Sequence, residues 1–292
     1  MHQFWLAVGF GLVTASVIAV AAVGLSLQFG ITNYINFAYG DFMALGAYFA
    51  WELNAGFLHW NIWVAMVAGA LLVGVFAVLV NQFVLGPFAR RFEKIFYVLI
   101  VTFALSLIIL SLVTSIWGAD VRRFNMPSEN PLHIGPFLLS VDQLIVIGIG
   151  LVLMVVVHLL LTMTRLGKSM RAMSDSTTLA MTSGIDTRMV TTVTWFLTGI
   201  LSGLAGVVLG ITAASIVPSF GETFLFVIFA AVIVGGVGSV YGAILGAVII
   251  GMVTEISAVF INPAYKLDTS FVVLILVLLF RPSGIFARVG KA

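Results

Sequence analysis

Long, uninterrupted apolar runs dominate the chain and predict its elements. No charged residue precedes Asp41, and five further stretches carry no charge: residues 53–89, 95–119, 143–164, 189–221 and 223–254. A helix needs about 20 apolar residues to cross the hydrocarbon core of a membrane. The runs do not alternate as the strands of a membrane barrel would. We predict nine apolar helical segments, with eight as the alternative because the seventh and ninth are short or irregular: residues 4–29, 40–58, 62–86, 95–118, 141–164, 189–214, 222–237, 239–261 and 267–285.

The composition narrows the class of protein. Among 292 residues, 8% are charged and 62% are hydrophobic, whereas an ordinary soluble domain has roughly 25% charged residues. This excludes a soluble enzyme, a disordered chain and a nucleic-acid binder. The chain has no cysteine, which excludes disulfides and thiolate metal sites. We therefore predict an all-α, polytopic integral membrane protein with about 8–9 transmembrane helices and a single domain over residues 1–292.

The distribution of basic residues predicts the orientation in the membrane. Cytoplasmic loops carry an excess of Lys and Arg. Three groups fall on the same side if the segment count is right: Arg90, Arg91 and Lys94; Arg165, Lys168, Arg171 and Arg188; and Arg281, Arg288 and Lys291. We expect that side to be cytoplasmic. The N-terminus and residues 119–140 then lie outside. Asp120 and Glu129 in that loop, with Asp142 just after it, offset Arg122 and Arg123.

The loop at residues 165–188 is more polar than the others and is rich in Ser and Thr. Ser174 or Asp175 is a candidate N-cap for a short helix, and Gly184 is suited to end one. We predict one or two short cytosolic helices here, with a plain solvated loop as the alternative.

Glycines four residues apart form two rows. Small residues at this spacing let helix backbones approach closely in lipid. We predict tight helix packing within the bundle, with a close subunit contact as the alternative. The rows are Gly199, Gly203, Gly206 and Gly210, and Gly238, Gly242 and Gly246.

Polar groups inside or beside the spans are candidates for a solute path. Asn33, Asn36 and Asp41 lie in one segment, ITNYINFAYGDF, and Glu255 lies well inside the eighth apolar run. A carboxylate in a span costs about 2.5–3.5 kcal/mol, so it normally faces a cavity or a partner. The alternative role is a hydrogen bond between helices. The first segment also favours a broken helix, which at membrane depth is tolerated where it is buried or lines a cavity. Glu222, at a helix start, is expected to be a capping residue.

The sequence has no complete motif for phosphate binding or metal binding. Gly167-Lys168-Ser169 resembles the end of a phosphate-binding loop, but Thr162 stands where that loop needs its first glycine. We therefore expect no ATPase site. The histidines are scattered without metal-ligand spacing, so we expect no metal site and no catalytic residues: His2, His59, His133 and His158.

Three blocks of sequence carry a family resemblance. They are GLSLQFGITNYINFAYGDFMALGAY at residues 24–48, GKSMRAMSDSTTLAMTSGIDTRMV at residues 167–190, and VIVGGVGSVYGAILGAVIIGMVTE at residues 232–255. With the C-terminal run KLDTSFVVLILVLLFRPSGIFAR, the chain resembles the branched-chain amino acid ABC-transporter permease family, specifically its H-type subunit.

The resemblance implies roles for particular residues. Residues 171–185 match the cytoplasmic coupling helix that docks into an ABC ATPase subunit, with Arg171, Ala172, Ala180, Gly184 and Ile185 at the coupling positions. Asn33, Asn36, Tyr39, Asp41 and Glu255 are the implied pathway residues. The family's usual His-Gly-Glu is Tyr39-Gly40-Asp41 here, so the acid is kept but shorter.

The resemblance also implies the assembly. The chain would be the permease subunit of a binding-protein-dependent ABC importer in the bacterial inner membrane, for branched-chain or other amino acids. Its partners would be a second homologous permease, two ABC ATPase subunits, a periplasmic or extracellular solute-binding protein and membrane lipid. The partner ATPases would bind ATP and Mg²⁺, so this chain would need no cofactor and would not be an enzyme.

Alternative functions follow from the same residues. Related permeases carry urea, amides or aromatic acids. An ion-coupled secondary transporter would use Asp41 and Glu255 to carry the coupling ion; it would show an internal repeat, which is not evident in the sequence. A membrane enzyme acting on lipid would need a cluster of catalytic groups, which the sequence lacks.

Overall fold

The computed structural model describes residues 2–91, 95–127, 132–135, 137–281 and 284–285. Four residues used to predict the orientation, Lys94, Glu129, Arg288 and Lys291, lie outside the described residues.

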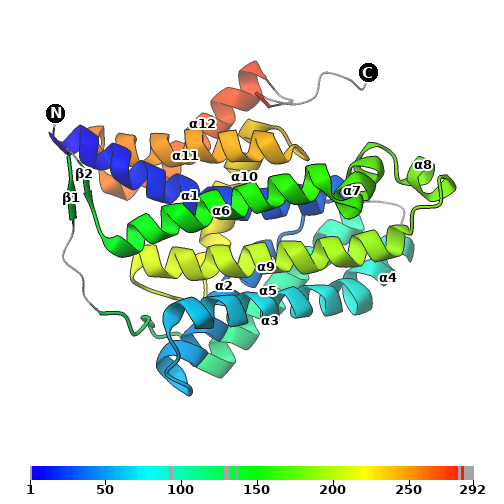
Figure 1. Ribbon diagram of the computed structural model, residues 1–292, viewed down its shortest axis with the longest axis horizontal. Helices are drawn as coiled ribbons and strands as arrows, with labels where there is room; N and C mark the ends of the chain where they lie inside the picture. Colours follow the sequence, from blue (N-terminus) through cyan, green and yellow to red (C-terminus); the bar gives the residue numbers. More distant parts are fainter. Residues whose placement is uncertain (1, 92–94, 128–131, 136, 282–283, 286–292) are drawn as a thin grey trace. The chain divides into compact units, whose positions relative to one another are not determined.

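Helices account for nearly all of the described chain (Figure 1). Each of the nine predicted apolar segments coincides with a helix, which confirms the all-α polytopic fold. Among the described residues, seven helices are long and apolar enough to cross a membrane. The elements are α1 (His2–Thr32), α2 (Tyr39–Trp51), η1 (Glu52–Gly56), α3 (Ile62–Val80), η2 (Asn81–Leu85), α4 (Gly86–Arg91), α5 (Ile95–Trp117), β1 (Leu132–Ile134), β2 (Phe137–Leu139), α6 (Val141–Met163), α7 (Arg165–Asp175), α8 (Thr177–Thr182), α9 (Thr187–Ala213), α10 (Phe220–Gly235), α11 (Val240–Phe260), η3 (Pro263–Tyr265) and α12 (Lys266–Phe280).

Two predicted segments contain short α-helices. Helix α10 has 16 residues, against about 20 for a full crossing. Helix α2 begins at Tyr39, one residue before the predicted start, and has 13 residues before it continues directly into η1, which ends at Gly56. The small antiparallel hairpin of β1 and β2 was not predicted, since three-residue strands give too short a pattern to recognise.

Contacts divide the chain into two compact units, each built from separated stretches of sequence. The larger unit consists of Leu27–Asn125 and Val155–Leu225. In it α2, α3 and α9 pack against one another. Its buried aromatic core includes Phe42 and Trp195, whose rings meet edge to face at 6.4 Å between centroids.

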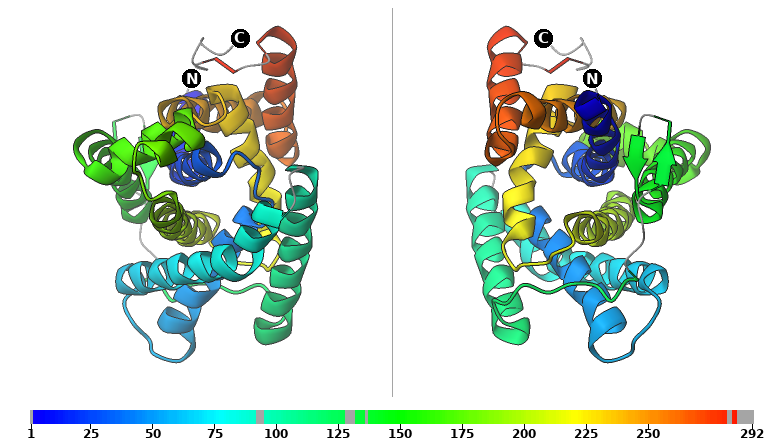
Figure 2. Two further views of the ribbon diagram at one scale, coloured as in Figure 1. Left: turned by 90° about the vertical axis from the view of Figure 1, so that its right-hand side faces the viewer. Right: turned by 90° about the vertical axis from the view of Figure 1, so that its left-hand side faces the viewer.

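The other unit consists of Met1–Ser26, Met126–Met154 and Phe226–Ala292. The first part of α1 packs against α11, where a Cβ added at Gly251 would overlap the backbone of Ala15. Helices α11 and α12 also pack together, and Figure 2 draws them in orange and red.

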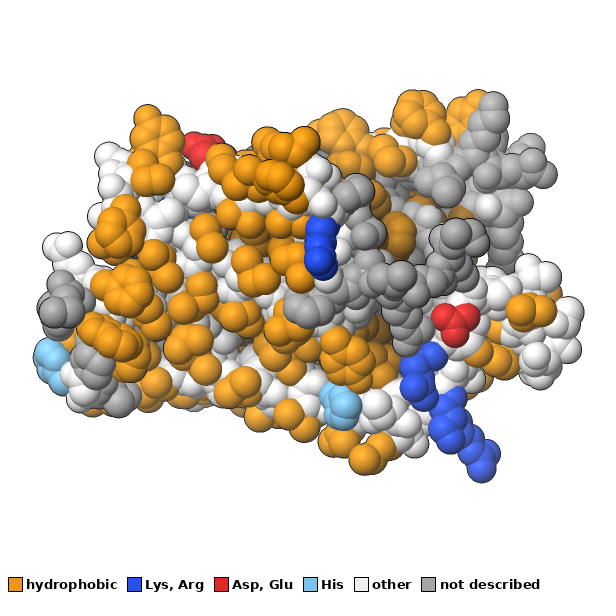
Figure 3. Space-filling model, turned by 90° about the horizontal axis from the view of Figure 1, so that it is seen from above, with side chains coloured by type: hydrophobic (Ala, Val, Ile, Leu, Met, Phe, Trp, Pro, Cys, Tyr) orange, Lys and Arg blue, Asp and Glu red, His pale blue; other side chains and the backbone are white. Residues whose placement is uncertain are grey.

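Exposed apolar side chains cover much of the surface. The face in Figure 3 is largely hydrophobic with few charged side chains. Helix α5 alone exposes Ile100, Phe103, Leu107, Ile108, Leu112 and Ile116. Soluble monomers rarely expose apolar patches of this extent, so these side chains are suited to contact lipid.

Candidate functional site

The segment between α6 and α9 forms two short capped helices. The hydroxyl of Thr164 accepts a hydrogen bond from the Gly167 N–H at 2.9 Å and caps α7. The hydroxyl of Ser176 accepts one from the Leu179 N–H at 3.3 Å and caps α8. Of the one or two short helices predicted, the structure shows two, but the candidate caps Ser174 and Asp175 are wrong. Both lie inside α7, because its helix starts earlier than the polar cluster indicated.

Gly184 ends this segment, as predicted. It follows α8 with φ +82°, a left-handed conformation that glycine adopts without steric cost. The carboxylate of Asp186 then accepts a hydrogen bond from the Met189 N–H at 3.0 Å and caps α9. The turn therefore connects two independently capped helices.

The predicted coupling residues differ in exposure. Arg171 and Gly184 are exposed, and Ala172 and Ile185 are half-buried. Ala180 is only 3% exposed, so its methyl group faces the protein. The apolar side chains that α8 presents outward are Leu179, 67% exposed, and Met181, 59% exposed.

These two outward residues were missed in the sequence. Leu and Met are hydrophobic, and in a chain this apolar they carry no visible signal without the helix geometry. Their exposed side chains offer apolar surface that a partner protein could bury.

A cavity of about 480 Å³ lies beside this segment within the larger unit. Arg188 and several hydroxyl and amide groups line it together with apolar side chains. The lining residues are Ile31, Thr32, Asn33, Tyr34, Asn81, Gln82, Gly86, Pro87, Ala89, Met173, Thr177, Met181, Thr187, Arg188, Thr191 and Thr192. The cavity therefore joins the end of α1 to α7, α8 and the start of α9.

The predicted pathway residues around the break after α1 fall into two groups. Asn33 lines the cavity and takes a left-handed conformation with φ +58°. Asn36, Tyr39 and Asp41 are buried. The side-chain oxygen of Asn36 accepts a hydrogen bond from the Ala38 N–H at 3.1 Å, which shapes the connection into α2.

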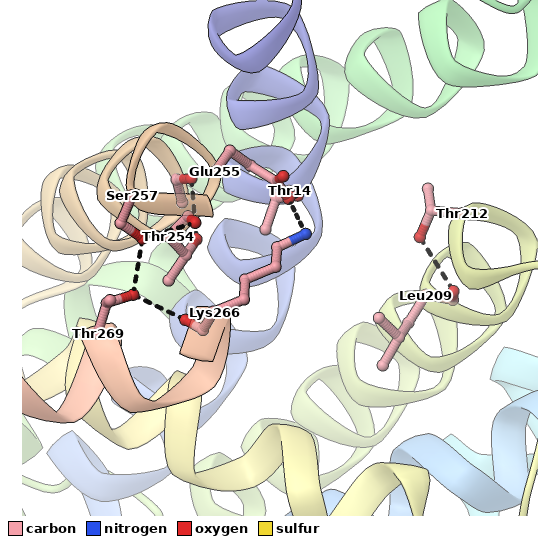
Figure 4. A network of polar contacts seen from close by, with 9 residues as sticks. Thr14, Leu209, Thr212, Thr254, Glu255, Ser257, Lys266 and Thr269 are labelled. Carbon is pink, nitrogen blue, oxygen red and sulfur yellow. Dashed lines mark hydrogen bonds and ion pairs between the residues drawn. The ribbon is translucent and has the colours of Figure 1, made fainter. Parts of the chain in front are cut away.

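Glu255 belongs to the other compact unit and already has partners (Figure 4). Its carboxylate forms an ion pair with Lys266 at the start of α12. It also accepts a hydrogen bond from the Thr14 hydroxyl at 2.5 Å. The group thus links α1, α11 and α12.

The ion pair predicts that removing its cation destabilises the folded protein more than neutralising its acid. Lys266→Met leaves the carboxylate of Glu255, 11% exposed, without its cation. Because Lys266 itself is partly exposed, we expect a loss of about 1–2 kcal/mol in unfolding free energy. Glu255→Gln keeps an acceptor for Thr14 and should cost less. Thermal melting of the purified protein in detergent measures both, with Lys168→Met as the control for removing an exposed lysine. Equal melting temperatures for Lys266→Met and Lys168→Met would contradict this role of the ion pair.

The first glycine row lies on α9 at close backbone contacts. A Cβ at Gly203 would meet the Ala70 Cα at 2.9 Å, and a Cβ at Gly199 would meet the Gly74 Cα at 2.9 Å. A Cβ at Gly206 would overlap the backbone of Met43 in α2. A Cβ at Gly210 would meet the ring of Phe124 at 2.9 Å.

The second row is shorter than predicted. Gly242 and Gly246 lie on α11, where added Cβ atoms would overlap the carbonyl oxygens of Gly235 and Ala231 in α10. Gly238 does not belong to this helix row. It lies in the turn before α11 with φ +80°, so its role is to allow this left-handed backbone conformation.

Among the residues that the structure describes, no group of three or more His, Cys, Asp or Glu side chains is arranged to hold a metal ion.

These features define a multi-pass helical membrane protein, in which a non-helical stretch separates α1 from α2 and a capped helical segment connects two candidate spans. The family model for the permease component of the branched-chain amino acid transport system matches residues 7–280. The chain therefore belongs to this family of ABC permeases, which confirms the resemblance seen in the sequence.

Curated relatives agree over nearly the whole chain. A probable branched-chain amino acid transport permease protein LivH of Methanocaldococcus jannaschii is 30% identical, covering 94% of this chain and 90% of that protein. The high-affinity branched-chain amino acid transport system permease protein LivH of Escherichia coli K12 is 27% identical, covering 95% and 94%. The solved structure of PsaBC from Streptococcus pneumoniae in complex with Fab has a similar fold, with a TM-score of 0.52 at 13% identity over 96% of this chain and 92% of that chain.

Membership of the family has direct consequences. Permease subunits of ABC systems are not themselves catalytic, as predicted. The family also implies ATPase and binding-protein partners.

Proposed function

We propose that this chain is the permease subunit of a binding-protein-dependent importer for branched-chain amino acids in a prokaryotic cytoplasmic membrane. It forms one half of the solute pathway, and a second homologous permease forms the other half. Two ABC ATPases bind at the cytosolic side, and a solute-binding protein delivers the amino acid outside. The names of the archaeal and bacterial relatives support this class of solute.

The observation that carries the proposal is the outward apolar side chain of Leu179 on the capped helix α8. A helix of this kind between two membrane spans fits the coupling helix of an ABC permease. Leu179 would enter a groove of the ATPase. Ala180 would instead hold α8 against the rest of the segment, because it is buried.

Residue contacts can transmit a displacement of α8 to the membrane-spanning helices of the larger unit. Helix α7 packs on the end of α6 without an intervening side chain, since a Cβ at Gly167 would overlap the Leu160 carbonyl. Met173 of α7 and Met181 of α8 line the cavity that also reaches Asn33. When ATP closes the ATPases, displacement of α8 would therefore change the cavity beside the broken helix. Asn33, Asn36, Tyr39 and Asp41 would border the solute path there.

Co-purification tests the assembly. The tagged chain is extracted from its native membrane in mild detergent and its partners are identified by mass spectrometry. We expect an ABC ATPase and a second hydrophobic permease to accompany it. Reproducible isolation of the chain alone, with solute transport driven by an ion gradient after reconstitution, would contradict the proposal.

A further inference from the structure

The two short helices begin in the same way. Helix α1 ends at Thr32, Asn33 has φ +58°, and α2 starts six residues later at Tyr39. Helix α9 ends at Ala213, Ala214 has φ +51°, and α10 starts six residues later at Phe220. Positive φ is uncommon outside glycine, so the two connections share an unusual backbone conformation at the same spacing.

Each short helix opens with an aromatic residue, a glycine and an acid. The triplets are Tyr39-Gly40-Asp41 and Phe220-Gly221-Glu222. The two glycines contact each other reciprocally, because a Cβ added at either one would overlap the carbonyl oxygen of the other. The first turns of α2 and α10 therefore meet backbone to backbone, with one carboxylate on each.

Asp41 is buried without a satisfying partner. Its side chain is 1% exposed, and neither carboxylate oxygen has a hydrogen-bond partner among the described residues. The carboxylate of Glu222 and the hydroxyl of Ser106 in α5 are its polar neighbours. Buried polar groups are almost always hydrogen-bonded, so an unpartnered carboxylate at a helix junction calls for a ligand.

The two carboxylates and the nearby hydroxyl indicate which kind of ligand fits the junction. Two carboxylates repel each other, and a bound cation removes the repulsion. The helix N-termini favour the negative charge of both acids. A calcium ion takes at least about six oxygen ligands, more than two carboxylates and one hydroxyl readily supply. An ammonium group has three N–H donors, which match Asp41, Glu222 and the Ser106 hydroxyl.

We propose that Asp41 and Glu222 bind the ammonium group of the amino acid at the junction of the two short helices. This inference rests on the proposed function, because it takes the solute to be an amino acid. The junction is closed in this structure and opens when the starts of α2 and α10 separate. Their contact consists of glycine backbone, so separation breaks few side-chain contacts.

Asp41→Asn and Glu222→Gln test the site in the complete transporter, reconstituted in liposomes with its binding protein and supplied with leucine. Loss of one charged hydrogen bond should lower the leucine moved per ATP hydrolysed by about tenfold in each variant. The double variant should lose little more than the worse single variant, because the two groups act on one ligand. Asp120→Asn, an exposed acid in the same compact unit, is the matched control and should transport normally.

Two results would overturn the inference, and a third would refute the proposed function. Glu222→Gln is the milder change, because the Glu222 side chain is half-buried. If this variant moves a normal amount of leucine per ATP, no ammonium group is held there. Independent, multiplicative losses in the two single variants would show that they do not share a ligand. Absence of ATP-driven leucine uptake by the wild-type complex would instead refute the proposed function on which the site rests.

Discussion

Leu179→Asp is expected to abolish the stimulation of ATP hydrolysis by the loaded solute-binding protein, lowering it by about tenfold or more. Burying a leucine side chain at an interface contributes about 1.5–3 kcal/mol, and a charge in its place must be desolvated. The side chain is largely exposed in the isolated chain, so the substitution should leave the fold intact. ATP hydrolysis by the reconstituted complex measures the effect.

Leu179→Met is the matched control, because it keeps an apolar side chain of similar volume and should retain coupling. Ala180→Asp is a poorer test, since a charge at a buried position also disrupts α8. Full stimulation in a correctly assembled Leu179→Asp complex would remove α8 from the ATPase interface.

Gly206→Ala is expected to cause the largest loss of stability. The added methyl group would overlap the backbone of Met43 in α2, and backbone atoms of a packed helix cannot rotate away. Overpacking of this kind costs about 1–3 kcal/mol. The melting temperature in detergent should fall clearly, and the yield of folded protein with it.

Gly148→Ala is the matched control for this change. Gly148 also lies within a helix, but an added Cβ meets no atom within 4 Å there. Since alanine favours helix by about 1 kcal/mol over glycine, the control should be neutral or slightly stabilising. Equal melting temperatures for the two variants would contradict the close contact between α9 and α2.

The apolar segments could be predicted because each is continuous and charge-free. The same pattern marked the α10 segment as short, but it could not show where α2 and α10 begin. Their starts depend on backbone conformation at Asn33 and Ala214, and Ala214 has no sequence signal for a left-handed conformation. The matching starts of α2 and α10 were missed for this reason, although their aromatic-glycine-acid triplets are visible once the helices are known.

The candidate site was predicted in part. Residues near one another in the chain, such as Asn33 to Asp41, could be recognised as a broken helix from their polarity. Contacts between distant segments could not be read from the sequence, so neither the Glu255–Lys266 ion pair nor the junction of Gly40 and Gly221 was foreseen. The outward direction of Leu179 likewise depends on where α8 begins, which is set by Ser176.

The most direct test of the central claim is leucine uptake into proteoliposomes, with and without the ATPase subunits. We predict that the complex of this chain, its partner permease, the ATPases and the binding protein accumulates leucine only when ATP is hydrolysed. We also predict that this chain alone does not accumulate leucine on an ion gradient. Accumulation by the chain alone on such a gradient would contradict an ATPase-coupled permease.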